Sequence, residues 1–163
     1  MPFTPYHLGP SAGIGILFLK IFDITTLLIA SIIIDIEPFL ILLFNLNYPI
    51  HGFFHSFLGG GIAALITAIV FYLLRDRVKK ITALLKLTQD STFLKIIWTA
   101  LFGVYLHIIL DSFLYSDIKP FYPSTYNPFY GLFSAQQIYS FCSWSFLAAI
   151  LIYLFKKYAK IRN

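Results

Sequence analysis

Charged residues are scarce in this chain: of its 163 residues, 12% are charged and 59% are hydrophobic. Soluble domains carry about 25% charged residues, so the composition excludes an ordinary soluble globular domain. Several apolar runs approach the roughly 20 residues that cross a bilayer as a helix. The composition therefore predicts an integral membrane protein.

Cysteine is also nearly absent. The only one, Cys142, cannot form an intrachain disulfide, so a disulfide framework is excluded. The opening stretch MPFTPYHLGPSAG has no basic residue, whereas a secretory signal peptide begins with a positively charged region. We therefore expect no cleavage there, so that His7 stays in the mature chain. Without repeats or linkers, residues 1–163 are predicted to form a single membrane-embedded helical domain.

Long apolar runs separated by short polar stretches predict an all-α fold, an integral membrane bundle of about five helical segments. The segments lie at about 8–20, 25–35, 51–74, 93–115 and 135–155, and the first two are short. The second segment either ends near 35 or continues to about 44. Pro38 should kink or end it, because proline removes a helix hydrogen bond and clashes with the preceding turn.

Lysine and arginine are unevenly distributed. In a five-pass arrangement eleven of the twelve basic residues fall on one side, and only Lys119 falls on the other. The eleven are Lys20, Arg75, Arg77, Lys79, Lys80, Lys86, Lys95, Lys156, Lys157, Lys160 and Arg162. Since loops rich in these residues stay cytoplasmic, the N-terminus is predicted outside and the C-terminus in the cytoplasm.

The net charge of +5 is then a signal of topology and of contact with anionic lipids. It does not predict a nucleic-acid partner. Asp23, Asp76 and Asp90 fall among the cytoplasmic cations, and we expect them to be solvated.

All four histidines and the remaining acidic residues fall toward the outer side in this topology. They are His7, His51, His55, His107, Asp35, Glu37, Asp111 and Asp117. At 1.5 Å per residue, His107 lies about 18 Å from Lys95, within a hydrocarbon core about 30 Å thick. An unpaired carboxylate at such depth is costly, so we expect a cation between the histidines and carboxylates. Asp117 and Lys119 are expected to pair at the surface.

Two pairs have the i, i+4 spacing that places both side chains on one face of a helix. His51 and His55 form the first pair, in HGFFHS, and His107 and Asp111 form the second, in HIILDS. Two such helices packed together offer four ligands, which is enough for tetrahedral zinc. Histidine with carboxylate also suits manganese or iron, so zinc is favoured only modestly.

Three further residues have more than one predicted role. Asp35 and His7 complete this metal site or hold a second ion. Glu37 is a ligand, a general base that activates a metal-bound water, or a solvated residue beside Pro38, and Asp35 is the alternative base. The competing hypothesis without a metal is a helix-packing network of His–Asp hydrogen bonds.

Four stretches in this order resemble the YdjM-type inner-membrane metal-dependent hydrolase family, over roughly positions 2–123. They are MPFTPYHLGP, the D-x-E of Asp35 and Glu37, HGFFHS, and HIILDS followed by KPFYP. The resemblance implies a distant relation to the zinc-dependent phospholipase C and nuclease superfamily.

The same resemblance implies a ligand set. One ion would be bound by Asp35, His51 or His55, His107 and Asp111, and another by Asp111 and His7. No histidine follows His107, so the later H-x-x-x-E pair of the soluble enzymes is missing and a full three-zinc centre is not expected.

The sequence thus predicts a membrane-embedded metal-dependent hydrolase with a His/Asp metal site near the outer leaflet. A lipid phosphodiester is the expected substrate, because headgroup phosphates lie at that depth, and membrane lipids are the expected partners. The alternatives are a non-enzymatic protein that binds or transports a metal ion or proton through the same cluster, and a degenerate family member with a structural or lipid-binding role. A transporter needs a polar route to the cytoplasmic side, which the apolar inner halves of segments three to five do not offer.

Overall fold

Helices make up all the regular structure in residues 4–84 and 87–161, which the computed structural model describes. In chain order they are the 3-10 helix η1 (Thr4–His7), α1 (Leu8–Leu17), α2 (Ile24–Ala30), the 3-10 helix η2 (Ile33–Asp35), α3 (Ile36–Leu43), the 3-10 helix η3 (Phe53–His55), α4 (Phe57–Leu84), α5 (Phe93–Ser112) and α6 (Ala135–Ile161). The predicted all-α bundle is confirmed. Lys86 and Arg162, two of the basic residues in the topology prediction, lie outside the described residues.

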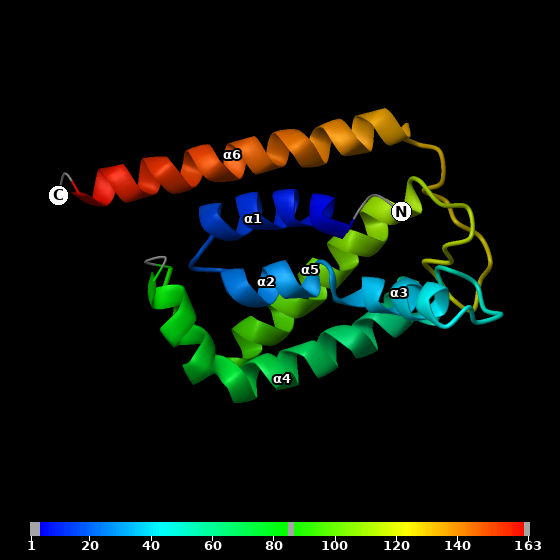
Figure 1. Ribbon diagram of the computed structural model, residues 1–163, viewed down its shortest axis with the longest axis horizontal. Coiled ribbons are helices and arrows are strands. Elements are labelled where there is room, and N and C mark those ends of the chain that lie inside the picture. The colour runs from blue at the N-terminus through cyan, green and yellow to red at the C-terminus, as the bar shows by residue number, and fades with distance from the viewer. Residues whose placement is uncertain (1–3, 85–86, 162–163) are drawn as a thin grey trace.

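Four segments are long and apolar enough to cross a membrane: Ile24–Leu43, Phe57–Leu84, Phe93–Ser112 and Ala135–Tyr158. Helix α1 has 10 residues and a length of about 15 Å, so it is too short to cross and instead packs along α6 (Figure 1). Leu73 on α4 and Phe155 on α6 are 75% and 74% exposed. Such bare apolar faces suit contact with lipid.

The helices are arranged around α5, which crosses obliquely between α2 and α4 (Figure 1). The core where these three helices meet is built mainly from small buried side chains, among them Ala30, Ala64 and Ala100. A Cβ atom on Gly103 would lie 2.9 Å from the Cβ of Ala30, so the glycine permits the close approach of α2 and α5. Small residues are typical of interfaces between membrane helices, which associate through close packing.

The second predicted segment is interrupted, but the break precedes Pro38. Helix α2 ends at Ala30, and the chain passes through η2 before α3 begins at Ile36. Pro38 is the third residue of α3, where a helix N–H has no intrahelical partner and its loss costs little. The prediction of a kink or stop at Pro38 was therefore wrong, and the break instead places Asp35 at a turn between two helices.

The third predicted segment begins later than expected. Ser56 has an extended backbone, and its hydroxyl accepts a hydrogen bond of 3.0 Å from the N–H of Gly59, so it caps α4. Residues 51–56 precede the α-helix and contain only the short η3. The prediction that His51 and His55 share one helix face was therefore wrong.

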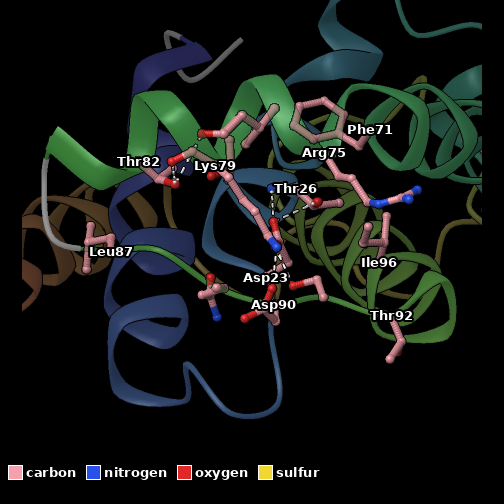
Figure 2. A pocket seen from close by; sticks show the side chains of 14 residues that line it. Asp23, Thr26, Phe71, Arg75, Lys79, Thr82, Leu87, Asp90, Thr92 and Ile96 are labelled. Atoms are coloured by element: carbon pink, nitrogen blue, oxygen red, sulfur yellow. Dashed lines mark hydrogen bonds and ion pairs between the residues drawn. The ribbon is translucent and has the colours of Figure 1, made fainter.

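At the end of the bundle where α1 joins α2, a cluster of polar residues lines a cavity of about 230 Å³ (Figure 2). Asp23 caps α2 by accepting hydrogen bonds from the N–H and hydroxyl of Thr26, at 2.9 and 2.8 Å, and from the hydroxyl of Ser91 at 2.6 Å. Asp23 is thus a structural residue, whereas solvation alone was predicted. Lys79 pairs with exposed Asp90 and lowers the pKa of that carboxyl.

Candidate metal centre

Helix α5 carries His107 and Asp111, both fully buried, on one face as their spacing predicts. The Nδ1 atom of His107 lies 2.7 Å from the carbonyl oxygen of Ser31, at the end of α2. A carbonyl only accepts hydrogen bonds, so Nδ1 is the protonated nitrogen. In the neutral ring, Nε2 then presents a lone pair, and it lies 3.3 Å from Oδ2 of Asp111.

His55, at the end of η3, is held in the same way from another direction. Its Nδ1 atom lies 3.0 Å from Oε2 of Glu37 on α3, and the other Glu37 oxygen accepts the Phe54 N–H at 3.3 Å. Because a carboxylate accepts, the Nδ1–H of His55 donates and its Nε2 carries the lone pair. A histidine whose second nitrogen donates to a carboxylate is the usual form of a metal ligand.

His51 repeats this pattern with a different carboxylate. Its Nδ1 atom lies 2.9 Å from Oδ2 of Asp117, in the loop after α5. The predicted pairing of Asp117 with Lys119 was therefore wrong. Burial, and then the neighbouring His55, lower the pKa of His51, which favours the neutral ring that can bind a metal.

Asp35, at the end of η2, lies close to both His107 of α5 and His55 of η3. Its Oδ1 atom lies 3.4 Å from Nε2 of His107 and 3.8 Å from Nε2 of His55. One ligand atom from each of Asp35, His55, His107 and Asp111 can be chosen so that all four lie within 4.8 Å of one another. Zinc bonds of about 2.0–2.1 Å in a tetrahedron separate the ligand atoms by about 3.4 Å, so these distances fit a divalent ion.

His7, from η1, lies on the other side of Asp111. Its Nε2 atom lies 3.2 Å from Oδ1 of Asp111, and its ring stacks on His107 with centroids 3.9 Å apart. Asp111 therefore directs one oxygen toward each of two histidines. Burial, and then the neighbouring His107, lower the pKa of His7.

Several buried ligand-type atoms in and around the centre have no hydrogen-bond partner among the described residues. They include the Nε2 atoms of His7, His51, His55 and His107 and both carboxylate oxygens of Asp111. Leaving such a buried atom without a hydrogen bond costs about 1–3 kcal/mol. A cation among these lone pairs would satisfy them together, so the donor set fits a metal.

Comparison with known proteins places the chain in a protein family. A family model described as YdjM inner membrane protein matches residues 1–162. The chain belongs to the YdjM inner membrane protein family. The match confirms the predicted YdjM family, and with the four apolar helices it identifies a membrane protein. No curated protein and no solved structure matches the chain.

In this YdjM family member the predicted site residues do not all play equivalent parts. Asp35, His55, His107 and Asp111 form the compact group. His7 touches that group through Asp111, and the His51 ring lies 5.0 Å from the His55 ring. Glu37 contacts His55 on the nitrogen that faces away from the group.

Two partners of the centre were missed from the sequence. Asp117 follows Asp111 by six residues, so the sequence places it at the same end of the bundle as the histidines. That position was the signal that could have predicted its contact with a histidine. The carbonyl of Ser31 leaves no signal in the sequence, because every residue has a carbonyl and only the packing of α2 on α5 selects this one.

Proposed function

We propose that this YdjM family member is a membrane-embedded metal-dependent hydrolase. The observation that carries the proposal is the convergence of the Nε2 lone pairs of His55 and His107 on the carboxylates of Asp35 and Asp111. Zinc fits this nitrogen and oxygen set, and manganese or iron would also fit it. A divalent ion at this point would lower the pKa of a bound water to about 7.

The acid–base roles follow from which atoms each carboxylate touches. Glu37 is engaged by the Nδ1–H of His55 and by the Phe54 N–H, so we assign it to holding His55 in place. Asp35 faces the inner nitrogens of both histidines and is the better base for a water molecule. His55, His107 and Asp111 would then be the three protein ligands, which leaves the open position that a catalytic site needs.

A lipid phosphodiester is the proposed substrate. One divalent ion among the four carboxylates of Asp35, Glu37, Asp111 and Asp117 gives a net charge of about −2, which repels a phosphodiester, and a second ion brings it to about zero. We place the second ion between His7 and Asp111, whose facing atoms are 3.2 Å apart; an ion there would require a small rearrangement.

The orientation in the membrane is also a proposal. Lys156 donates hydrogen bonds to the carbonyls of Ile16 and Leu17, at the end of α1 remote from His7. The basic end of the bundle and the metal centre are therefore at opposite ends, and the positive-inside rule would place the centre outside. Labelling of single cysteines by an impermeant reagent in intact cells would test this orientation.

The function is tested by two measurements on purified protein. Elemental analysis should find about one to two divalent ions per chain, and fluorescent phospholipids should be cleaved in a chelator-sensitive manner. Asp35→Asn should abolish cleavage while retaining metal, whereas His107→Ala should lose both. Asp90→Asn, at the far end of the bundle, is the matched control.

Metal binding without hydrolysis is the second candidate. No chelator-sensitive product from any lipid class, with metal present, would favour it over the hydrolase. Transport is less well supported, because the core between the centre and the basic end is lined by Ala64, Ala68, Ala100 and Val104. The buried hydroxyl of Thr67 in that region donates its hydrogen to the carbonyl of Ala63, so that hydrogen is not available to solvate a transported ion.

A further inference from the structure

An apolar groove lies between the α2–α3 arm and α4, beside the metal centre. Its walls come from Ile29 and Ile33 on one side, Ala63 and Val70 on the other, and Tyr48 at one end. Its volume is about 480 Å³. The groove begins level with η3 and runs along α4 into the membrane-spanning part of the bundle.

The charged residue among those that line the groove lies at one end. Thr67 lines the middle, but its hydroxyl donates to the carbonyl of Ala63 at 2.8 Å, so it offers no hydrogen to a ligand. Glu37 lies at the end near η3, and its Oε2 atom contacts Nδ1 of His55 at 3.0 Å. One residue, His55, therefore separates the apolar groove from the candidate ion position.

We propose that this groove binds one acyl chain of the lipid whose headgroup reaches the metal centre. The inference rests on the proposed hydrolase function and specifies its substrate as a lipid with at least one long acyl chain. The carbonyl end of the chain lies near Tyr48 and Phe54, and the methyl end lies near Val70 and Phe71.

The size of the groove favours an acyl chain over a protein segment. A methylene group fills about as much space as a water molecule, about 30 Å³, so the volume of about 480 Å³ holds on the order of 15 methylene groups. The α4 part of the groove, from Ala63 to Phe71, is about 12 Å long, which gives a cross-section of about 40 Å² or less. A helix about 10 Å across needs about 80 Å², and an extended peptide would leave its backbone groups without partners against apolar walls.

The test uses full-length, metal-loaded protein in phosphatidylcholine nanodiscs that contain a trace of phosphatidylglycerol with a photoreactive diazirine in one chain. A diazirine near the chain end should label Val70 and Phe71, and one near the ester should label Tyr48 and Phe54. Excess unlabelled phosphatidylglycerol should reduce this labelling at least about tenfold. The face of α6 around Phe155, which is 74% exposed, provides the internal control for bulk lipid.

Two tryptophan variants separate groove binding from general contact with lipid. Val70 lines the groove and is 45% exposed, whereas its neighbour Ile69 is 50% exposed and does not line it. Val70→Trp should reduce the competed labelling several-fold and shift the preference toward shorter chains, and Ile69→Trp should change neither. Labelling equal on α4 and α6, a reversed chain direction, or equal effects of the two variants would overturn the proposal.

The labelling does not depend on turnover, so the two hypotheses can fail separately. Competed labelling of the groove without any lipid hydrolysis would support the acyl site and refute the hydrolase. Chelator-sensitive hydrolysis with labelling spread evenly over the helices would support the hydrolase and refute the acyl site.

Discussion

The contact between Glu37 and His55 gives a measurable prediction for metal affinity. The carboxylate of Glu37 accepts the His55 Nδ1–H at 3.0 Å, and both side chains are almost buried, at 10% and 0% exposed. A hydrogen bond to a charged group contributes about 1.5–3 kcal/mol. Glutamine still offers an oxygen that accepts the His55 Nδ1–H, so Glu37→Gln removes the charge and about half of that energy. Since 1.4 kcal/mol is a factor of ten in an equilibrium constant, this variant should weaken metal binding by about three- to tenfold.

In the assay, the purified protein competes for zinc with a chelator of known zinc affinity. The signal of the metal-free chelator then reports how much zinc the protein binds. Asp90→Asn is the matched control, because Asp90 is an exposed carboxylate paired with Lys79 at the far end of the bundle. Asp117→Asn reports in parallel on His51, whose Nδ1 lies 2.9 Å from Asp117. A dissociation constant for Glu37→Gln within about twofold of the unmodified protein would refute the assigned role of Glu37.

Three further outcomes are expected. His107→Ala and Asp111→Ala should each reduce bound metal to background in elemental analysis, because each removes an atom from the compact group; metal retained in both would point to the packing network instead. Metal affinity should decrease as the pH is lowered, and the decrease should begin at a higher pH than for an ordinary histidine. Burial alone would lower the pKa of His55, but its contacts with Asp35 and Glu37 raise it. A chelator titration repeated from pH 8 to 5 should therefore show protons displacing metal above pH 6.5. Gly103→Ala should destabilise the protein by about 1–3 kcal/mol, seen as a lower thermal midpoint, because its Cβ would meet Ala30 at 2.9 Å.

The helices that cross the membrane could be predicted because their signal is length and hydropathy, which need no knowledge of neighbours. Helices α4, α5 and α6 all match predicted segments, with shifted ends. The start of α4 was misplaced because the apolar residues of HGFFHS extend the hydrophobic run toward the N-terminus. The true start is marked by the Ser56 cap, which depends on a single side-chain hydrogen bond. The break before Asp35 was misplaced because Pro38 is costly inside a helix and tolerated in its first turn.

The pairing of His107 with Asp111 needed only the helical repeat, so the sequence predicted it correctly. The pairing of His51 with His55 used the same rule and failed, because the rule holds only where the backbone is helical. His55 nevertheless comes close to His107, with ring centroids 5.6 Å apart. Its approach is set by Glu37 and by the packing of η3 on α4, neither of which the spacing encodes.

The sequence by itself determined the membrane class, the helical fold and the types of ligand available, because hydropathy, helical period and donor chemistry are properties of residues and their near neighbours. The tertiary structure decided which nitrogen of each histidine faces the centre, since that choice depends on Ser31, Glu37 and Asp117 from other segments. It also decided that the apolar groove ends beside His55, because the α2–α3 arm and α4 must pack before a groove exists between them.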